Sequence, residues 1–223
     1  MRAIVFDTSS IISIVMNDLI DVLKDLKTDF RGEFYITPSV KNELVDKPLR
    51  TKNYSLEAMM VQKLIDESYL KILKPKKSTN QIETIANHLF KVNGKDVQIL
   101  QAGEIEALML ALELNAEAFV IDERTTRVLI EESDNLKDLL ERKLHTKVIV
   151  NKDNLKVISK MAKNIKIIRS TELAFVAYEK GLLERYISSK YNKKDQVDAL
   201  LWGMRTRGCS ISVDEIEKAK KMI

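Results

Sequence analysis

Ile4-Val5-Phe6-Asp7 reads as a short buried strand that ends at a carboxylate. Phe119-Val120-Ile121-Asp122 repeats the pattern much later in the chain. Open α/β sheets form their ligand crevices at the carboxyl ends of their strands, so both aspartates fall where a site would form. Strand and helix patterns alternate around these two runs, and this order predicts a parallel sheet.

The periodicity of apolar residues predicts the elements between the two runs. We expect a first helix from about Ser10 to Leu26 that is capped by Thr8 or Ser9. After a strand at Phe34-Tyr35-Ile36, Thr37 and Pro38 open a helix that carries Glu43. The remaining expectations are helices at 55–67, 80–90, 103–114 and 125–132, strands at 70–73 and 118–121, and a loop at 91–101.

The composition is typical of a folded intracellular domain. The 223 residues, with 45% hydrophobic and 31% charged, suffice for one large domain or for one domain with a small appendage. The apolar runs are too short to cross a bilayer, and Asp7 interrupts any signal-peptide core. Cys209 is the single cysteine, which favours the reducing cytosol and excludes an internal disulfide. The net charge of +4 favours a polyanionic partner only weakly.

Two further acidic runs could meet the two aspartates in one pocket. They are Val40-Lys41-Asn42-Glu43 and Gly103-Glu104-Ile105-Glu106, each in a segment expected to be helical. Hard cations such as Mg²⁺ and Mn²⁺ prefer carboxylate oxygens, so four converging acids indicate a divalent-metal site. Asp7 taken alone could equally be a helix cap, and Glu104 could be a first-turn acid favoured by the helix dipole.

The helix that begins at Gly103 presents two candidate ligands on different faces. At about 100° per residue, Glu104 shares its face with Ala107, Leu108 and Ala111, whereas Glu106 lies with Met109 and Leu110. A carboxylate in apolar surroundings is costly unless it is paired or binds a metal, so Glu104 is preferred and Glu106 is the second choice.

These motifs together resemble the PIN domain, a metal-dependent nuclease fold. The resemblance rests on Val5–Ser10, on Pro38-Ser39-Val40 with Glu43, and on Gly103–Ala107 followed by Ile121-Asp122-Glu123-Arg124. The last two runs are similar to the Gly-Glu-x-Glu-Ala and Asp-Asp-Arg signatures of a largely prokaryotic branch. Residues 177–183 and 204–212 also resemble the ending of that group.

The resemblance implies an α/β three-layer sandwich with a parallel sheet of about four or five strands. Residues 1–169 would form the PIN-like catalytic domain, with helical insertions at 51–100 and 133–168. Residues 170–223 would be a helical C-terminal extension packed on that domain.

The same resemblance implies roles for individual residues. Asp7, Glu43, Glu104 and Asp122 would be catalytic, and Asp7, Glu104 and Asp122 would hold one or two Mg²⁺ or Mn²⁺ ions. Glu123 stands where the family usually has a second Asp and is, like Glu106, a second-choice ligand. Adjacent strand residues point to opposite faces, so one of Asp122 and Glu123 should reach the metal, and Asp122 is favoured. Ser9 would hydrogen-bond to a carboxylate or to the phosphate of RNA. Arg124 and Arg127 would contact phosphate or RNA, or else pair with Glu131 or Glu132.

The function that follows is a metal-dependent endoribonuclease in the cytoplasm, either the toxin of a toxin and antitoxin pair or an RNA-processing factor. Its partners would be RNA, an antitoxin protein and a second copy in a homodimer, with no membrane. An alternative is a nucleic-acid-binding or assembly module that kept the fold while losing efficient chemistry. No Walker-type or dinucleotide-binding glycine motif supports a small-molecule phosphate enzyme.

Overall fold

The computed structural model describes residues 2–132 and 135–222. The strands are β1 (Ala3–Phe6), β2 (Glu33–Ile36), β3 (Lys71–Ile72), β4 (Phe90–Val92), β5 (Lys95–Val97), β6 (Ala118–Val120), β7 (Val148–Val150) and β8 (Ile167–Ile168). The first helices are α1 (Thr8–Met16), α2 (Ile20–Phe30), α3 (Pro38–Lys41), the π-helical turn η1 (Asn42–Asp46), α4 (Lys47–Thr51), α5 (Ser55–Asp66) and α6 (Asn80–Asn87). The later helices are α7 (Ala102–Glu113), α8 (Arg124–Glu131), α9 (Leu136–Leu144), α10 (Lys152–Ala162), α11 (Ser170–Glu179), α12 (Lys193–Thr206) and α13 (Val213–Lys220).

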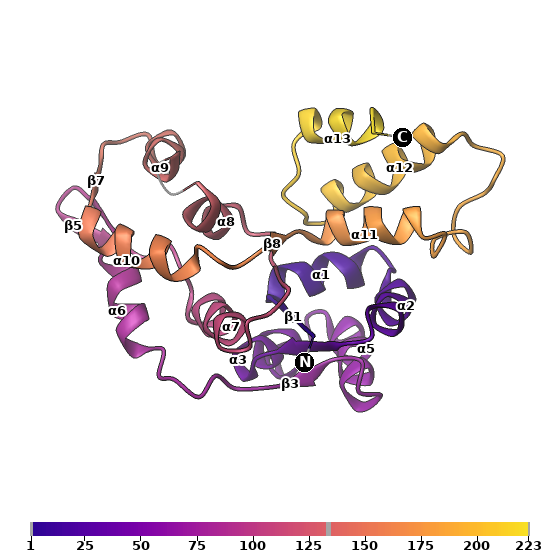
Figure 1. Cartoon of the computed structure of the whole chain (residues 1–223), viewed down its shortest axis with the longest axis horizontal. Helices are drawn as coiled ribbons and strands as arrows, with labels where there is room; N and C mark the ends of the chain where they lie inside the picture. The colour runs from indigo at the N-terminus through magenta and orange to yellow at the C-terminus, as the bar shows by residue number, and fades with distance from the viewer. Residues whose placement is uncertain (1, 133–134, 223) are drawn as a thin grey trace.

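The main sheet has five parallel strands in the order β3-β2-β1-β6-β8, and helices flank it (Figure 1). Strand β1 is central, with Ile4 opposite Phe34 on β2 and opposite Ala118 on β6. All four residues of β1 are buried, which is the pattern of a strand covered on both faces. The predicted three-layer α/β fold with a parallel sheet is therefore confirmed.

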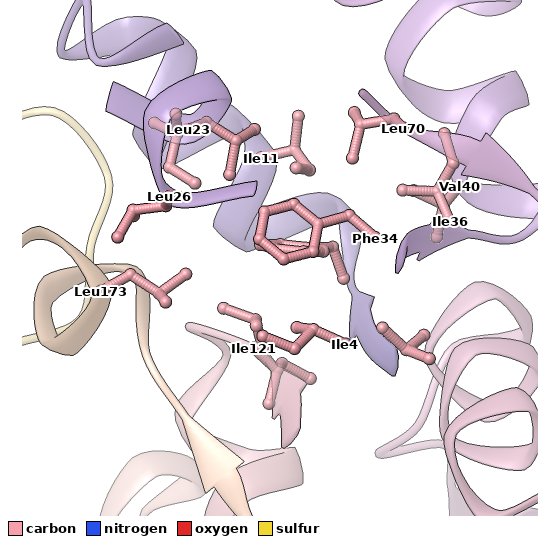
Figure 2. Packing of buried hydrophobic residues seen from close by; sticks show 14 of the residues in the cluster. Ile4, Ile11, Leu23, Leu26, Phe34, Ile36, Val40, Leu70, Ile121 and Leu173 are labelled. Carbon is pink, nitrogen blue, oxygen red and sulfur yellow. The ribbon is translucent and has the colours of Figure 1, made fainter. Parts of the chain in front are cut away.

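The main core packs around the central strands. Phe6 and Phe34 are fully buried with ring centroids 5.0 Å apart, and Ile11, Ile36 and Leu70 close around them (Figure 2). Ile121 and Leu173 enter the same cluster from distant parts of the sequence. The packing thus fixes β1 and β6 side by side, and with them the residues that follow both strands.

The first helix is shorter than predicted. The sequence indicated one helix from about Ser10 to Leu26, but α1 ends at Met16 and α2 begins at Ile20. Between them Asp18 adopts a left-handed backbone (φ 59°), and Leu19 turns into the core. Asp7, rather than Thr8 or Ser9, is the N-cap of α1, because its side chain accepts a hydrogen bond from Ser9 N.

The segment 91–101 is not the predicted loop. Strands β4 and β5 form an antiparallel hairpin around Asn93-Gly94, both at positive φ, as a tight two-residue turn requires. Strand β7 pairs with β4 on its other side, so segments 51–100 and 133–168 jointly build a second sheet. These two insertions were predicted to be helical, yet they also contribute strands. Residues 133 and 134, where the second one starts, lie outside the described residues.

Helix α7 links the main core to a second core. Ala107, Leu108 and Leu110 belong to the main core, whereas Ile105 and Met109 pack with the residues of α6, α8, α9 and α10. A helix buried on nearly all sides is apolar all round, and eight residues of α7 are buried. Even so, no helix in residues 2–132 and 135–222 is both long and apolar enough to cross a membrane.

The C-terminal helices α11, α12 and α13 surround a third, smaller core of Val197, Leu201, Ile211 and Ile216 (Figure 1). Helix α11 also reaches the main core through Leu173 and Ala177. The predicted domain boundary between residues 169 and 170 stays a prediction. Helix α11, which follows this boundary, packs both on the main core and on the third core.

Replacing Phe34 by Ala should lower the free energy of unfolding by about 3–5 kcal/mol, because it leaves a cavity beside Phe6. Urea unfolding followed by circular dichroism would measure this loss. The control is Leu56→Ala, since Leu56 is 68% exposed, and its effect should stay within about 0.5 kcal/mol. Equal losses in the two variants would contradict the assignment of the core.

Candidate active site

The carboxyl ends of β1 and β6 meet at one edge of the sheet. Asp7 N donates to Val120 O at 2.9 Å, so the ladder continues one residue past β1. Asp7 and Asp122 therefore both leave the sheet at this edge, as their places after the two strands predicted. Three other acids approach from α7, η1 and the start of α8.

Asp7 is almost completely buried, with 3% of its surface exposed. Its Oδ2 accepts hydrogen bonds from Ser9 N (3.0 Å) and Ser9 Oγ (2.7 Å). Burial raises the pKa of Asp7, and the nearby Glu43 carboxylate raises it further, while the two donors of Ser9 oppose the rise. Ser9 thus orients the Asp7 carboxylate through two neutral donors, which do not balance a negative charge on it.

Ser9 ties the two strand ends together. Its hydroxyl donates to Asp7 Oδ2 and also accepts from Asp122 N at 3.0 Å. The sequence predicted a hydrogen bond from Ser9 to a carboxylate or to the phosphate, and in this structure the hydroxyl donates to the Asp7 carboxylate. We therefore assign Ser9 to the positioning of Asp7.

Glu43 lies on the π-helical turn η1. Pro48 accounts for this widened turn, because a proline ring clashes with the carbonyl four residues earlier in a regular helix. Glu43 Oε2 accepts from Thr8 Oγ1 at 2.6 Å, which places it next to Asp7. A Cβ at Gly103 would stand 3.1 Å from Glu43 Oε1, so the glycine allows Glu43 to approach α7 closely.

Glu104 belongs to the same acidic group. Its Oε2 accepts from Gln101 N (3.1 Å) and from Thr126 Oγ1 (3.0 Å). Burial raises the pKa of Glu104 to about 7, and the charges of Asp7 and Glu123 contribute to the rise against the two donors. Glu104 is therefore close enough to both acids to feel their charge.

Glu106 points elsewhere. It is buried, and its Oε2 accepts from Ser39 N at 2.9 Å at the start of α3. This bond satisfies a backbone donor in the first turn of α3, which is a structural task. The geometry thus agrees with the preference for Glu104 over Glu106.

Asp122 and Glu123 face different partners. Asp122 Oδ2 accepts from Ser13 Oγ (2.5 Å) and Ser170 Oγ (2.6 Å), and its Oδ1 accepts from Ser170 N (2.8 Å). Glu123 caps α8 by accepting from Thr126 N at 2.6 Å, and its charge reaches Glu104. Because Asp122 is buried and directed at three donors, we favour Glu123 as the fourth acid of the site, although the sequence favoured Asp122.

The two predicted phosphate contacts on α8 differ in exposure. Arg124 is exposed at the first turn and lines a groove with Ser9, Arg142 and Lys143. Arg127 lies one turn further and is half-buried, with its Nη2 3.4 Å from Ser210 O. Arg124 is thus available at the acid edge, whereas Arg127 faces a separate cavity.

Sequence reasoning missed the hydroxyl residues that hold the acids. Thr8, Thr126, Ser13 and Ser170 each donate to one of the carboxylates described above. Thr8 directly follows Asp7 in the sequence, and this position next to an acid could have indicated that its hydroxyl belongs to the site. No local signal could link Ser170 to Asp122, because they meet only through the tertiary fold.

The donor set suits a hard divalent cation. Asp7, Glu43, Glu104 and Glu123 offer carboxylate oxygens from four elements. Burial first, and neighbouring carboxylates in addition, raise the pKa values of Asp7 and Glu104, and a bound cation would offset both effects. Among the described residues, no three Asp, Glu, His or Cys side chains are close enough to share one ion as they stand. A bound ion would have to draw these carboxylates together.

A family model described as a PIN domain matches residues 3–137. The chain belongs to the PIN-domain family. Searches of curated proteins and of solved structures find no match. PIN domains are in general nucleases that act on nucleic acid and typically use divalent metals. The matched segment contains all the acids of the site.

Metal-free protein should lose stability as the pH rises from about 4.5 to about 7. In this window folded Glu104 keeps a proton that the unfolded chain has released, so the free energy of unfolding falls by up to about 3 kcal/mol. Urea unfolding in EDTA across this range would measure the slope, which should flatten in Glu104→Gln. The control Glu184→Gln should keep it, and an unchanged slope in Glu104→Gln would contradict the assignment.

Asp122→Asn should lower the free energy of unfolding by about 1–3 kcal/mol. The single amide oxygen of Asn cannot accept all three hydrogen bonds that Ser13 Oγ, Ser170 Oγ and Ser170 N donate to Asp122. Glu123→Gln should cost less than about 1 kcal/mol, since Gln can still accept from Thr126 N. Thermal unfolding of both variants would test the difference. A larger loss in Glu123→Gln would reverse the two roles.

Proposed function

We propose that this PIN-domain protein is a Mg²⁺- or Mn²⁺-dependent endoribonuclease that hydrolyses phosphodiester bonds in RNA. The observation that carries the proposal is the pair of buried Asp7 and half-buried Glu104, which feel each other's charge, have raised pKa values and accept only from neutral hydrogen-bond donors. Buried like charges are costly unless a cation joins them. Glu43 lies near Asp7 and Glu123 lies near Glu104, so four acids gather at this edge of the sheet.

Asp7, Glu104 and Glu123 would hold the ion, with Asp122 as the alternative to Glu123. The chemistry that a bound Mg²⁺ or Mn²⁺ supplies is Lewis-acid stabilisation of the phosphate charge and activation of water. The site takes one or two ions.

The chain's own residues do the positioning. Ser9 fixes the Asp7 carboxylate, and Gln101 N and Thr126 fix that of Glu104. Thr8 holds Glu43, which orients the attacking water by accepting a hydrogen bond from it. Preorganised groups of this kind reduce the reorganisation needed when the substrate arrives.

A groove of about 640 Å³ starts at Ser9, Asp122 and Glu123 and supplies a path for the RNA backbone. Arg124, Arg142 and Lys143 line it, and their charges are those that bind phosphates without reading sequence. These three basic side chains lie beside the acids, so an RNA strand bound to them would pass the site.

We also propose action in the cytoplasm, either as the toxin of a toxin and antitoxin pair or as an RNA-processing factor, with a homodimer as the working unit. These proposals rest on the resemblance to the prokaryotic PIN branch. The second candidate function is a nucleic-acid-binding or assembly module with weak chemistry. It is favoured by the separation of the acids, since no three of them in the described residues are positioned to share an ion.

Purified protein should cleave a mixed panel of single-stranded and structured RNA in Mn²⁺, and cleavage should stop in EDTA. Asp7→Asn should reduce the rate by about 100-fold or more, because a charged ligand is lost. Mn²⁺ should also raise the melting temperature of the wild type but not of Asp7→Asn. Gel electrophoresis and thermal unfolding supply the two readouts.

Glu184→Gln is the matched control and should behave as wild type in both assays. Cleavage that persists in EDTA or in Asp7→Asn would contradict a metal-dependent nuclease. A Mn²⁺-dependent rise in melting temperature together with RNA binding, but with no cleavage, would favour the binding module.

A further inference from the structure

A second cavity lies beside α8. It has a volume of about 750 Å³ and is bounded by α8, by the start of α11 and by the loop between α12 and α13. Figure 1 shows α8 and this loop on either side of β8. Ligand sites usually have about 300–1,000 Å³, so the cavity can take a small molecule or the end of a chain.

Arg127 is the unsatisfied cation of this cavity. Its Nη2 donates weakly to Ser210 O at 3.4 Å, and its Nε is buried without a hydrogen-bond partner among the described residues. No carboxylate in the described part of the chain forms an ion pair with it. Leaving a charged donor unsatisfied in a buried place is unfavourable, and a bidentate anion would correct it.

The other charges of the cavity are already committed or stand at its rim. Arg169 forms ion pairs with Glu215 (2.6 Å) and Glu172 (3.3 Å), so these two carboxylates are engaged by Arg169. The charges of Glu131, Glu215 and Asp122 still reach Arg127 through space and partly offset its charge. Glu131 and Glu132 are exposed. The Arg169 guanidinium in addition repels that of Arg127, and burial together with this repulsion lowers the pKa of Arg127.

The cavity adjoins the groove beside the acids. Arg124 and Ser210 line both of them, so they form the wall between the two spaces. Glu123 is the N-cap of α8, and Arg127 lies four residues later, which is about 6 Å along the helix axis. A strand in the groove would therefore bring one of its ends within reach of Arg127.

We propose that the Arg127 cavity binds a phosphate monoester at the end of an RNA strand whose backbone lies in the groove. The fork of Arg127 takes two oxygens of the terminal phosphate, and Arg124 contacts the next phosphate at the shared wall. This inference rests on the proposed function and deepens it, because the enzyme then selects substrates with a phosphorylated end.

The test measures binding without cleavage, on the full chain in EDTA. Fluorescence anisotropy compares one short RNA with a 5′-phosphate, with a 3′-phosphate and with hydroxyls at both ends. One of the phosphorylated forms should bind about tenfold more tightly than the hydroxyl form, as a bidentate charged contact predicts. Millimolar inorganic phosphate should abolish the difference, since it carries the same chemistry.

Arg127→Gln should remove the preference for the phosphorylated RNA, and Arg127→Lys, which keeps the charge and the packing of the stem, should reduce it. The control Arg31→Gln should retain it, because Arg31 is exposed at the end of α2. Equal binding of the three RNAs, or a preference that survives in Arg127→Gln, would overturn the inference. Cleavage in Mn²⁺ is scored separately, so a preference without cleavage supports the cavity and counts against the nuclease.

Discussion

The hydroxyl of Ser9 is the contact on which the site depends, because it joins the ends of the two strands that carry the acids. It donates to the Asp7 carboxylate and accepts from the backbone of Asp122. The backbone bond from Asp7 N to Val120 O continues the parallel ladder to the same point. Strand pairing alone would align β1 and β6, but this hydroxyl also sets the direction in which the Asp7 side chain leaves the sheet.

Neutral hydrogen-bond donors, rather than cationic side chains, orient the acids, so no ion pair within the described residues balances the charge of these carboxylates. Ser9, Thr8 and Thr126 orient Asp7, Glu43 and Glu104 without cancelling their charge. A lysine or arginine in the same places would have stabilised the metal-free protein while removing its affinity for a cation. Asp122 contrasts with this group, since it is enclosed by Ser13 and Ser170 and joins α1 to α11. Two adjacent acids thus have different partners, since Asp122 accepts from α1 and α11 whereas Glu123 caps α8.

Much of the fold could be predicted from sequence where the signal was local. The buried runs that end at Asp7 and Asp122 predicted both central strands, and Thr37 with Pro38 predicted the start of α3. The hairpin at Asn93-Gly94 was missed although its turn residues were present, because both strands have only three residues and β5 (Lys95-Asp96-Val97) is mostly polar. The strand that pairs on the other side of β4 is β7, which lies far away in the sequence. The break at Asp18 was missed since the apolar pattern continues across it. At the site, the acids were foreseeable as a group, but the separation of Asp122 from Glu123 depends on Ser170, which only the tertiary fold brings near.

The inserted segments give α8 its place between two spaces. Leu129 of α8 packs with Leu136, Leu140 and Val148 in the second core, which exists because β7 joins the hairpin of β4 and β5. With one face fixed in that core, α8 has to present Glu123 to the acids at its first turn and Arg127 to the C-terminal cavity at its second. The second sheet therefore acts on the site through α8, and residues far from the acids decide where Arg124 and Arg127 lie relative to them.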